Sequence, residues 1–305
     1  MSAVLHSGIA SPLVSLPRLR SQGGGALVAD ERTVPEETAI GFVYDGAPHA
    51  VMMATPADLE DFALGFSLSE AVIDVPSQIA ALEIATTPLG IELRMQLAAR
   101  SGKACPKRHR LTGPSGCGLC GVETLDAASR PVQWLRSDSA RWRCSANDIA
   151  QAMGALGEAQ ALNREARALH AAGFWQPGQG LVALREDVGR HNALDKLAGA
   201  LARRRTAAAS GMVLLTSRVS VELVQKTARL GAPMIVAVSA PTALAVRTVE
   251  SCAITLVALA RERDFEVYTH PDRIDIGPQV GVAQAWRLPL TDSTEPRNGS
   301  PSFHS

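Results

Sequence analysis

The sequence has few aromatic residues and no excess of either charge. Only 4% of the 305 residues are Phe, Trp or Tyr, and 30 Lys and Arg side chains balance 30 Asp and Glu side chains. Without a net charge, the chain has no overall field that would attract it to nucleic acid or to an anionic membrane. We therefore expect neither partner, and any site for an anion must come from a local group of residues.

Long hydrophobic runs are missing as well. No apolar stretch reaches the roughly 18 residues that a membrane-spanning helix needs, and residues 1–20 lack a basic region followed by an apolar one. The five cysteines are few and odd in number, which argues against a secreted disulfide framework. These absences predict a protein of the cytoplasm, where cysteines serve chemistry or metal binding.

The distribution of turn formers and apolar residues predicts two domains between two tails. Residues 1–35 and 288–305 are rich in Gly, Ser and Pro, and we expect both to be flexible tails. Residues 36–145 predict a smaller α+β domain, which includes a mobile loop over residues 100–121. Residues 146–287 predict a C-terminal α/β domain that binds a cofactor.

Strands and one helix are expected in the N-terminal domain. Two β-rich runs on either side of Asp45 and Gly46 predict a hairpin. Thr55 is expected to cap a helix that begins with Pro56. Two further strands are predicted within residues 79–97, so this part of the chain is classed as α+β.

The C-terminal half alternates short apolar runs with amphipathic helices. Helices are expected at residues 145–159, capped by Ser145, and at residues 162–173. From residue 180 onward, strand-like runs alternate with helices, which is typical of βαβ units. The pattern predicts a mostly parallel sheet with helices on both faces, which is a three-layer α/β domain. Ligands of such sheets bind at the carboxyl ends of the strands.

Two cysteines, Cys117 and Cys120, lie among glycines in a polar loop. Zinc would need two further ligands, and Cys105 and His109 offer them only at an uncommon spacing. A thioredoxin-like dithiol would lie at a helix start after a strand, whereas a polar loop precedes this pair. The glycines and the basic residues 107–110 fit a third use better, in which an exposed thiolate accepts sulfur and passes it on.

A second unusual segment, residues 185–196, carries many polar side chains where a strand is expected to end. One interpretation is a helix start capped by Asp187, with His191 satisfied by its neighbours. The other is a site for a ligand that carries phosphate or a heterocycle. The segment contains the polar residues Asp187, Arg190, His191, Asn192, Asp195 and Lys196.

Seven motifs follow one another along the chain: "TPADLEDFALGFSLSEAVI", "GCGLCGVETL", "HAAG", "LREDVGRHNALDKL", "TSRVSVELVQK", "VSAPTALAV" and "VYTHPDRI". Together they resemble the formate dehydrogenase accessory sulfurtransferase family, known as FdhD/NarQ. The resemblance covers nearly everything between the two tails. So many motifs in one order argue against chance similarity.

The resemblance implies a sulfurtransferase that takes sulfur from a cysteine desulfurase. It passes the sulfur to the molybdenum or tungsten bis(guanine dinucleotide) cofactor that formate dehydrogenase needs for activity. That cofactor, for molybdenum the bis(molybdopterin guanine dinucleotide) form, is bound as the sulfur acceptor. By the resemblance, Cys117 carries the persulfide and Cys120 is its helper or an alternative carrier, and no protein-bound metal is implied.

The resemblance also implies a cofactor-binding segment, a cytidine deaminase-like fold for the C-terminal domain, and a homodimer. The implied segment consists of Leu259, Ala260, Arg261, Glu262, Arg263 and Asp264. Family members commonly carry a glycine between the basic residues of this segment, where this chain has Glu262. As a hypothesis, backbone amides at helix starts and Arg261, Arg263 and either Arg190 or Lys196 hold the guanine and pyrophosphate groups.

Three other functions compete with sulfur transfer. Zinc-dependent deamination needs His-x-Glu before Pro-Cys-x-x-Cys. Here two alanines follow His170, and this histidine comes after the cysteine pair, which argues against deamination. A chaperone that delivers the cofactor without moving sulfur, and a scaffold stabilised by zinc, remain the alternatives.

Overall fold

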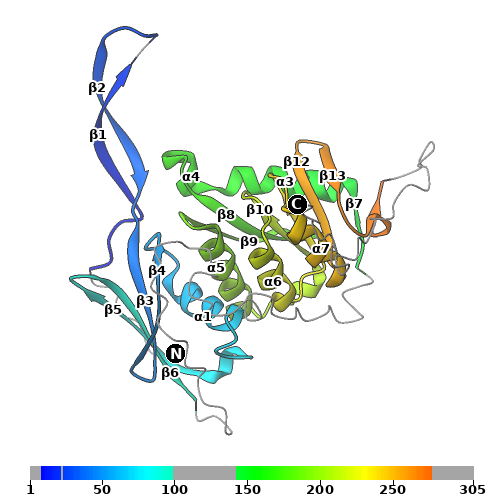
Figure 1. Ribbon diagram of the computed structural model, residues 1–305, viewed down its shortest axis with the longest axis horizontal. Coiled ribbons are helices and arrows are strands. Elements are labelled where there is room, and N and C mark those ends of the chain that lie inside the picture. Colours follow the sequence, from blue (N-terminus) through cyan, green and yellow to red (C-terminus); the bar gives the residue numbers. More distant parts are fainter. Residues whose placement is uncertain (1–7, 22, 99–141, 277–305) are drawn as a thin grey trace, which may run out of the picture. The chain divides into compact units, whose positions relative to one another are not determined.

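The computed structural model describes residues 8–21, 23–98 and 142–276 (Figure 1). The helices and strands named below belong to one unit, Met1–Asp275. Of the second unit, Ile276–Ser305, only Ile276 is described. The fold is mixed α/β, as the sequence predicts. Among the described residues, no helix combines the length and the apolar character that crossing a membrane requires.

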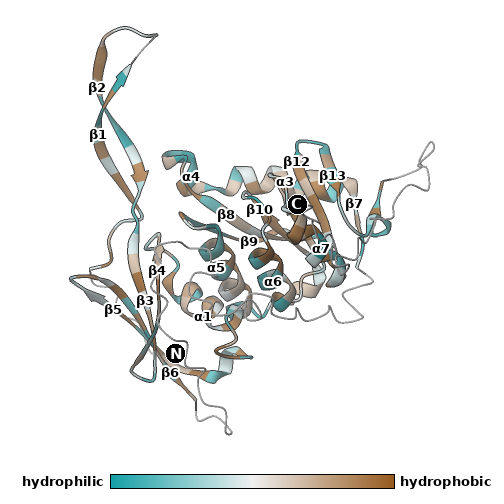
Figure 2. Cartoon of the chain, in the orientation of Figure 1, coloured by the Kyte–Doolittle hydropathy of each residue, from teal (hydrophilic) through white to brown (hydrophobic). Residues whose placement is uncertain are grey.

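A two-stranded ribbon precedes the rest of the fold. Strands β1 (Leu13–Ser21) and β2 (Leu27–Pro35) pair antiparallel along their whole length. The sequence predicts a flexible tail over residues 1–35, and the structure differs there. Both strands contain Leu and Val, and Gly23 and Gly24 adopt the positive φ that a tight connection needs. Apolar residues of the ribbon are brown in Figure 2.

A four-stranded sheet follows, with the strand order β4-β3-β6-β5. The hairpin of β3 and β4 is confirmed, and Asp45 and Gly46 at its turn have φ values of 50° and 80°. Positive φ at both central residues is the requirement of a type I′ turn. The two strands predicted within residues 79–97 are also confirmed. The strands are β3 (Thr38–Tyr44), β4 (Ala47–Ala54), β5 (Ile79–Thr87) and β6 (Gly90–Leu97).

Helix α1 (Leu59–Ser69) packs on this sheet through aromatic side chains. The rings of Phe42 and Phe66 stack with their centroids 3.9 Å apart. The expected cap at Thr55 is wrong, because the helix begins four residues later and Asp58, at φ 52°, occupies the cap position. The hydroxyl of Thr55 instead accepts a hydrogen bond from the amide of Val188 at 3.1 Å.

The central sheet has six strands in the order β13-β12-β11-β10-β8-β9. It is mixed, and the expected mostly parallel sheet is wrong: β10, β11 and β12 run parallel, whereas β8, β9 and β13 pair antiparallel with their neighbours. The strands are β8 (His170–Gln176), β9 (Gly180–Asp187), β10 (Met212–Leu215), β11 (Met234–Ala237), β12 (Thr255–Arg261) and β13 (Asp264–Val267).

The helix predicted at residues 162–173 is shorter in the structure. Helix α4 (Ala161–Ala166) ends at Arg167, which has a left-handed conformation, and the "HAAG" motif begins β8. This motif lies between β9 and β10 and pairs with both strands. Pairing within a buried sheet outweighs the helix preference of its alanines.

Helices cover both faces of the central sheet, so the predicted three layers are present. Side chains alternate along β10: Val213 and Leu215 pack with α5, α6 and α7, whereas Met212 and Leu214 pack with α3. The helices over the sheet carry both apolar and polar residues, brown and teal in Figure 2. They are α3 (Ala146–Ala159), α5 (Arg190–Arg203), α6 (Val221–Leu230) and α7 (Ala243–Ser251).

The ends of two of these helices have a clear chemical basis. The Ser145 hydroxyl accepts a hydrogen bond from the Asp148 amide, and the Asp148 carboxylate accepts one from the Ser145 amide, which confirms the cap of α3. Gly231 ends α6 in a left-handed conformation. Short elements complete the described fold: η1 (Pro76–Gln78), β7 (Cys144–Ser145), η3 (Ala208–Ser210), η4 (Pro271–Arg273) and β14 (Ile274–Asp275).

Helices α1 and α5 touch backbone to backbone. A Cβ atom at Gly65 would lie 1.7 Å from the carbonyl oxygen of Asp195, and one at Gly199 would lie 1.9 Å from the carbonyl oxygen of Asp61. Only glycine fits at either position without moving one helix away from the other. This contact joins the four-stranded sheet and its helix to the central sheet.

Candidate functional site

The polar segments that the sequence singles out lie along one edge of the central sheet. Strands β10, β11 and β12 run parallel, so their carboxyl ends meet at that edge. Strand β8 is antiparallel to β10 and begins there: the amide of Ala171 donates to the hydroxyl of Thr216 at 2.9 Å. His170 at the start of β8 lies opposite Asp187 at the end of β9. The structure thus brings His170 and Asp187 to the edge at which residues 259–264 also lie.

Residues 259–264 comprise the end of β12, the turn at residues 262–263 and the first residue of β13. A bulge lies between Ala258 and Arg261, and Arg261 pairs with Asp264 across the turn. Arg261, Glu262, Arg263 and Asp264 are exposed and accessible to a ligand. Leu259 is half-buried, and Ala260 is 2% exposed and packs in the core against α3, so its side chain contributes packing. The predicted segment is therefore one hairpin with four accessible side chains.

Glu262 adopts a backbone conformation that favours glycine. Its φ is 53°, in the left-handed region where a Cβ atom is disfavoured. The family resemblance described above implies glycine at this position. Glu262 therefore brings a negative charge and backbone strain to the same turn.

Asp187 and Lys196 form a fully buried ion pair at the start of α5. The Nζ–Oδ2 distance is 2.6 Å, and both side chains are 0% exposed. The Asp187 carboxylate also accepts hydrogen bonds from the amide of Thr55, the amide of Gly189 and the side chain of Asn192. Lys196 donates a second bond to the Thr55 carbonyl at 2.8 Å.

This network corrects two expectations from the sequence. Gly189 occupies the cap position of α5, so Asp187 is not the cap residue. Lys196 is enclosed between Asp187 and Thr55 and cannot reach a ligand without breaking a buried pair. The structure excludes Lys196 from phosphate binding and leaves Arg190 as the cation at this helix start.

A second buried cation, Lys226 of α6, lies between two carboxylates. Its ammonium is 2.8 Å from Asp195 of α5 and 3.2 Å from Glu70, which follows α1. Burial disfavours the charged form of Lys226, but the two carboxylates outweigh it and hold the pKa of this lysine above its usual value. The pair ties α1, α5 and α6 together.

The ring of His191 lies near these buried charges. Its side chain is 2% exposed, and neither ring nitrogen has a hydrogen-bond partner among the described residues. Burial lowers the pKa of His191 to about 3, with further contributions from the charges of Arg190 and Lys226. Burial and then Arg190 also lower the pKa of His170. His191 is therefore neutral at physiological pH, so one ring nitrogen can donate a hydrogen bond and the other can accept one.

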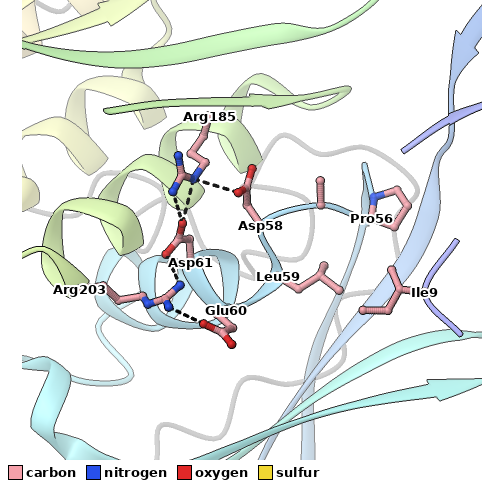
Figure 3. Close-up of a pocket in the computed structure, with 9 residues that line it drawn as sticks. Ile9, Pro56, Asp58, Leu59, Glu60, Asp61, Arg185 and Arg203 are labelled. Atoms are coloured by element: carbon pink, nitrogen blue, oxygen red, sulfur yellow. Dashed lines mark hydrogen bonds and ion pairs between the residues drawn. The ribbon is translucent and has the colours of Figure 1, made fainter. Parts of the chain in front are cut away.

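A hollow beside α1 contains a group of paired charges (Figure 3). Arg185 of β9 contacts Asp58 at 3.3 Å and Asp61 at 2.5 Å, and Arg203 of α5 contacts Asp61 at 3.0 Å and Glu60 at 2.6 Å. Asp61 is almost fully buried between the two arginines. These pairs connect α1 and the residue before it to β9 and α5, with two arginines facing three carboxylates.

The cysteines divide into two groups. Cys117 and Cys120 lie outside the described residues, as do Cys105, His109 and the predicted loop over residues 100–121. Burial raises the pKa of the Cys144 thiol to about 12 and also raises that of Cys252. Within the described ranges, no group of three or more His, Cys, Asp or Glu side chains is arranged to hold a metal ion. Neither described cysteine is suited to thiolate chemistry at neutral pH.

Comparison with protein families shows to which family this chain belongs. The model of the FdhD/NarQ family matches residues 35–275. The chain belongs to the FdhD/NarQ family. The match begins at the last residue of β2 and ends with β14, so it includes both larger sheets. The ribbon of β1 and β2 precedes it almost entirely.

Similar proteins are known from several bacteria, each named sulfur carrier protein FdhD. The protein of Agrobacterium fabrum is 52% identical over 251 residues, which is 82% of this chain and 92% of the relative. That of Brucella abortus is 52% identical over 244 residues, 80% of this chain and 90% of the relative. That of Xanthomonas campestris pv. campestris is 44% identical over 265 residues, 86% of this chain and 93% of the relative.

A solved structure shares the fold. A crystal structure from Desulfotalea psychrophila, of a protein described as a formate dehydrogenase accessory protein, superposes with a TM-score of 0.68 at 22% identity. The superposition covers 86% of this chain and 99% of the other.

Sequence-based reasoning misses the buried contacts between the two larger sheets. It gives no role to Asp61 or Lys226, which are paired with residues 124 and 31 positions away along the chain. The sequence contains one indication of the Lys226 pair: Lys226 follows Leu223 by three residues, which places it on the apolar, buried side of α6. A cation on such a face needs a buried partner.

Proposed function

We propose that this protein is a sulfur carrier that serves the maturation of formate dehydrogenase. The observation that carries the proposal is 52% identity, over 82% of the chain, to a sulfur carrier protein FdhD. The cysteines agree with it, because Cys144 and Cys252 are buried thiols with raised pKa values. Sulfur chemistry is thereby left to the cysteines among glycines and basic residues, of which we assign Cys117 as the carrier and Cys120 as its helper or an alternative carrier.

In the proposed reaction, the Cys117 thiolate attacks the terminal sulfur of a persulfide held by a cysteine desulfurase. A new S–S bond forms at Cys117 while the S–S bond of the donor breaks, and the donor cysteine leaves as a thiolate. The terminal sulfur then passes to the metal of the acceptor cofactor: the S–S bond at Cys117 breaks, Cys117 leaves as the thiolate, and the reduced metal supplies the two electrons that turn the sulfur into a sulfido ligand. In a second possible ending, Cys120 attacks the inner sulfur, so that hydrosulfide leaves and a disulfide forms.

The acceptor that we propose is the molybdenum, or tungsten, bis(guanine dinucleotide) cofactor of formate dehydrogenase. The β12–β13 hairpin is the proposed binding segment, and its exposed Arg261 and Arg263 support this assignment. Arginine is suited to phosphate because its planar group donates two parallel hydrogen bonds. We further propose that the protein is a homodimer and acts in the cytoplasm.

The first test is sulfur loading of the purified full-length protein. The protein is incubated with a cysteine desulfurase and free cysteine, and its intact mass is recorded without reductant. We expect the wild-type protein and Cys144→Ala to gain sulfur and Cys117→Ala to gain none. Cys144→Ala is the matched control because it removes a thiol that burial makes unreactive.

The same experiment decides between the carrier and its main rival. If Cys117→Ala gains as much sulfur as the wild type, the assignment of Cys117 is wrong. If no variant gains sulfur and Cys117→Ala still matures formate dehydrogenase fully, sulfur transfer is wrong and the protein is a chaperone that delivers the cofactor.

A further inference from the structure

The ribbon of β1 and β2 lies almost entirely outside the family match, which begins at residue 35, and its base is fixed. Ile9, which precedes β1, packs against the core formed by the four-stranded sheet and α1. The amide of Glu36, which follows β2, donates to the carbonyl of Pro12 at 2.9 Å. Arg32 of β2 donates to the carbonyl of Ala166, the last residue of α4, at 3.1 Å. The outer half of the ribbon therefore starts from a fixed position.

One face of the ribbon carries charged side chains that have partners within this chain. Side chains that stand opposite each other in the register share a face. The Nη2 atom of Arg18 and the Nε atom of Arg20 lie 2.9 Å and 3.7 Å from the Oδ2 atom of Asp30. The same face carries Arg32, which is bonded to α4. The charges of this face are therefore paired without a second molecule.

The other face of the ribbon is apolar and exposed on its outer half. Leu19 is 66% exposed and Leu27 is 62% exposed. The one charged side chain that β1 and β2 place on this face, Glu31, accepts a hydrogen bond from the hydroxyl of Ser15 at 2.9 Å. A two-stranded hairpin is marginally stable by itself, so exposed leucines on it indicate a surface that another molecule covers. This surface, which we call the apolar face, consists of Pro17, Leu19, Ser21, Leu27, Ala29 and Glu31.

A second exposed apolar surface lies on the four-stranded sheet. Val51 and Met53 of the edge strand β4 are 66% and 44% exposed, and they share a face because they are two residues apart. The residues between and before them on β4 pack in the core with α1, so Val51 and Met53 lie on the face opposite that helix. Gly41 and Ala39 of β3 stand opposite them in the register. These four residues are called the β4 surface below.

The charges of the ribbon indicate what covers it. The outer half has two basic and two acidic side chains, so it has no net charge that would select an acidic or a basic partner. A second copy of this chain is equally neutral there and is not repelled. This chain also supplies both apolar surfaces, so two copies can cover each other. The charged residues are Arg18, Arg20, Asp30 and Glu31.

The area of the ribbon distinguishes two ways in which copies could meet. Each strand has nine residues, and the pair is therefore about 30 Å long and about 10 Å wide. Two ribbons packed against each other would bury about 600 Å² in total, which is the size of a crystal-packing contact. Two reciprocal contacts, each between a ribbon and a β4 surface, would bury about 1,200 Å², which is enough for a specific interface.

We infer that the apolar face of the ribbon packs on the β4 surface of a second copy of this chain, and that two copies exchange ribbons in this way. The inference rests on the homodimer of the proposed function and does not depend on sulfur transfer. Leu19 and Leu27 of one copy lie against Val51 and Met53 of the other, and the reverse contact is the same. Such reciprocity closes the assembly at two copies.

The inference is tested by sedimentation of the full-length protein over a range of concentrations, which gives the dissociation constant of the dimer. The double variant Leu19→Asp, Leu27→Asp should weaken the wild-type dimer about a hundredfold or more, because each contact loses two apolar side chains and gains two carboxylates. Val51→Asp should weaken it about tenfold or more, because each contact loses one apolar side chain.

A matched control separates these contacts from a general effect of acidic charge. Leu244→Asp replaces an exposed leucine of α7, on the central sheet, and should leave the dissociation constant unchanged. A thermal melt of each variant shows that the protein compared is folded.

A mixture of two variants tests the exchange itself. When the double ribbon variant is mixed with Val51→Asp, the intact ribbon of the second chain can pack on the intact β4 surface of the first. One of the two contacts is then restored, whereas each variant alone has both contacts damaged. We therefore expect the mixture to associate more tightly than either variant does by itself.

Every outcome supports or overturns a stated part of the inference. If the wild type is a monomer, or if the double ribbon variant associates like the wild type, the ribbon contact is wrong. If the ribbon variant dissociates and Val51→Asp does not, the ribbon does not dock on the β4 surface. A mixture that associates no better than its components overturns the exchange.

These results are independent of sulfur loading at Cys117. If the ribbon variants associate like the wild type and the wild type gains sulfur, the exchange is wrong and the carrier function stands. If the ribbon and β4 variants weaken the dimer and the wild type gains no sulfur, the exchange stands and the carrier function fails.

Discussion

The start of α5 and the β12–β13 hairpin lie at the same edge of one sheet, and both carry charges of either sign. At the start of α5, Asp187 and Lys196 are 0% exposed and pair at 2.6 Å. In the hairpin, four consecutive charged side chains, residues 261–264, are exposed. Charge that is paired inside the protein fixes the position of a helix, whereas exposed charge remains accessible to a ligand. Burial therefore assigns different roles to two segments that have similar composition.

The strongest test of this contrast removes one lysine from the buried pair. Lys196→Met leaves the Asp187 carboxylate buried without its cation, so we expect the free energy of unfolding to fall by about 3–5 kcal/mol. Urea denaturation followed by circular dichroism measures the change. The matched control is Arg263→Met in the hairpin, which should change the stability by less than about 0.5 kcal/mol. Equal losses in the two variants would contradict the contrast.

A second test uses the pH dependence of stability. The folded protein holds the pKa of His191 at about 3, below the usual 6.5, so the unfolded chain binds the proton more readily between these values. The neutral ring contributes its full share to the free energy of unfolding above pH 6.5. As the pH falls from 6.5 toward 3, this contribution decreases by about 1.4 kcal/mol per pH unit.

The variant His191→Gln isolates this contribution, because glutamine does not titrate. Denaturation of the wild type and of the variant is compared across the same pH window. As the pH is lowered, the free energy of unfolding of the wild type should decrease more steeply than that of His191→Gln, and the difference between the two slopes should equal the value given above. Parallel curves would show that the buried ring does not resist protonation.

The smallest expected effect concerns the strained turn of the hairpin. Glu262→Gly removes a Cβ atom from a left-handed position, which relieves about 1–2 kcal/mol of strain and costs about 0.5–1 kcal/mol of chain entropy. We expect a net gain in stability of about 0.5 kcal/mol, measured by thermal denaturation. Glu262→Ala removes the charge and keeps the Cβ atom, so it should give no such gain. A larger gain for alanine would attribute the effect to charge.

Local sequence patterns predict the elements whose contacts are close along the chain. The turn at Asp45 and Gly46 and the cap at Ser145 depend on residues within a few positions, and both are confirmed. Likewise, the alternation of strands and helices that the sequence predicts from residue 180 onward is present. Residues 259–264, which the family resemblance implies as a cofactor-binding segment, belong to the β12–β13 hairpin, and their binding role stays a prediction.

The predictions from the sequence are wrong where contacts with residues far away along the chain determine the local structure. Threonine is a common helix-capping residue, but the hydroxyl of Thr55 accepts a hydrogen bond from the amide of Val188, 133 positions away along the chain. The "HAAG" motif has alanines typical of a helix, yet two neighbouring strands pair with it. In the sequence, Asp187 and Lys196 look like residues that could bind a ligand. In the structure both are buried and hydrogen-bonded to the backbone of Thr55, so they are not accessible to one. No local pattern contains that information.

The backbone contact at Gly65 and Gly199 also bears on how the protein unfolds. Because each glycine lies against a carbonyl of the other helix, α1 and α5 cannot separate gradually by rearranging side chains. Separation would expose bare peptide groups together with the buried pairs at Asp61 and Lys226. We therefore expect the two larger sheets to unfold in one cooperative step, and a fragment cut between them to lack part of its own interior.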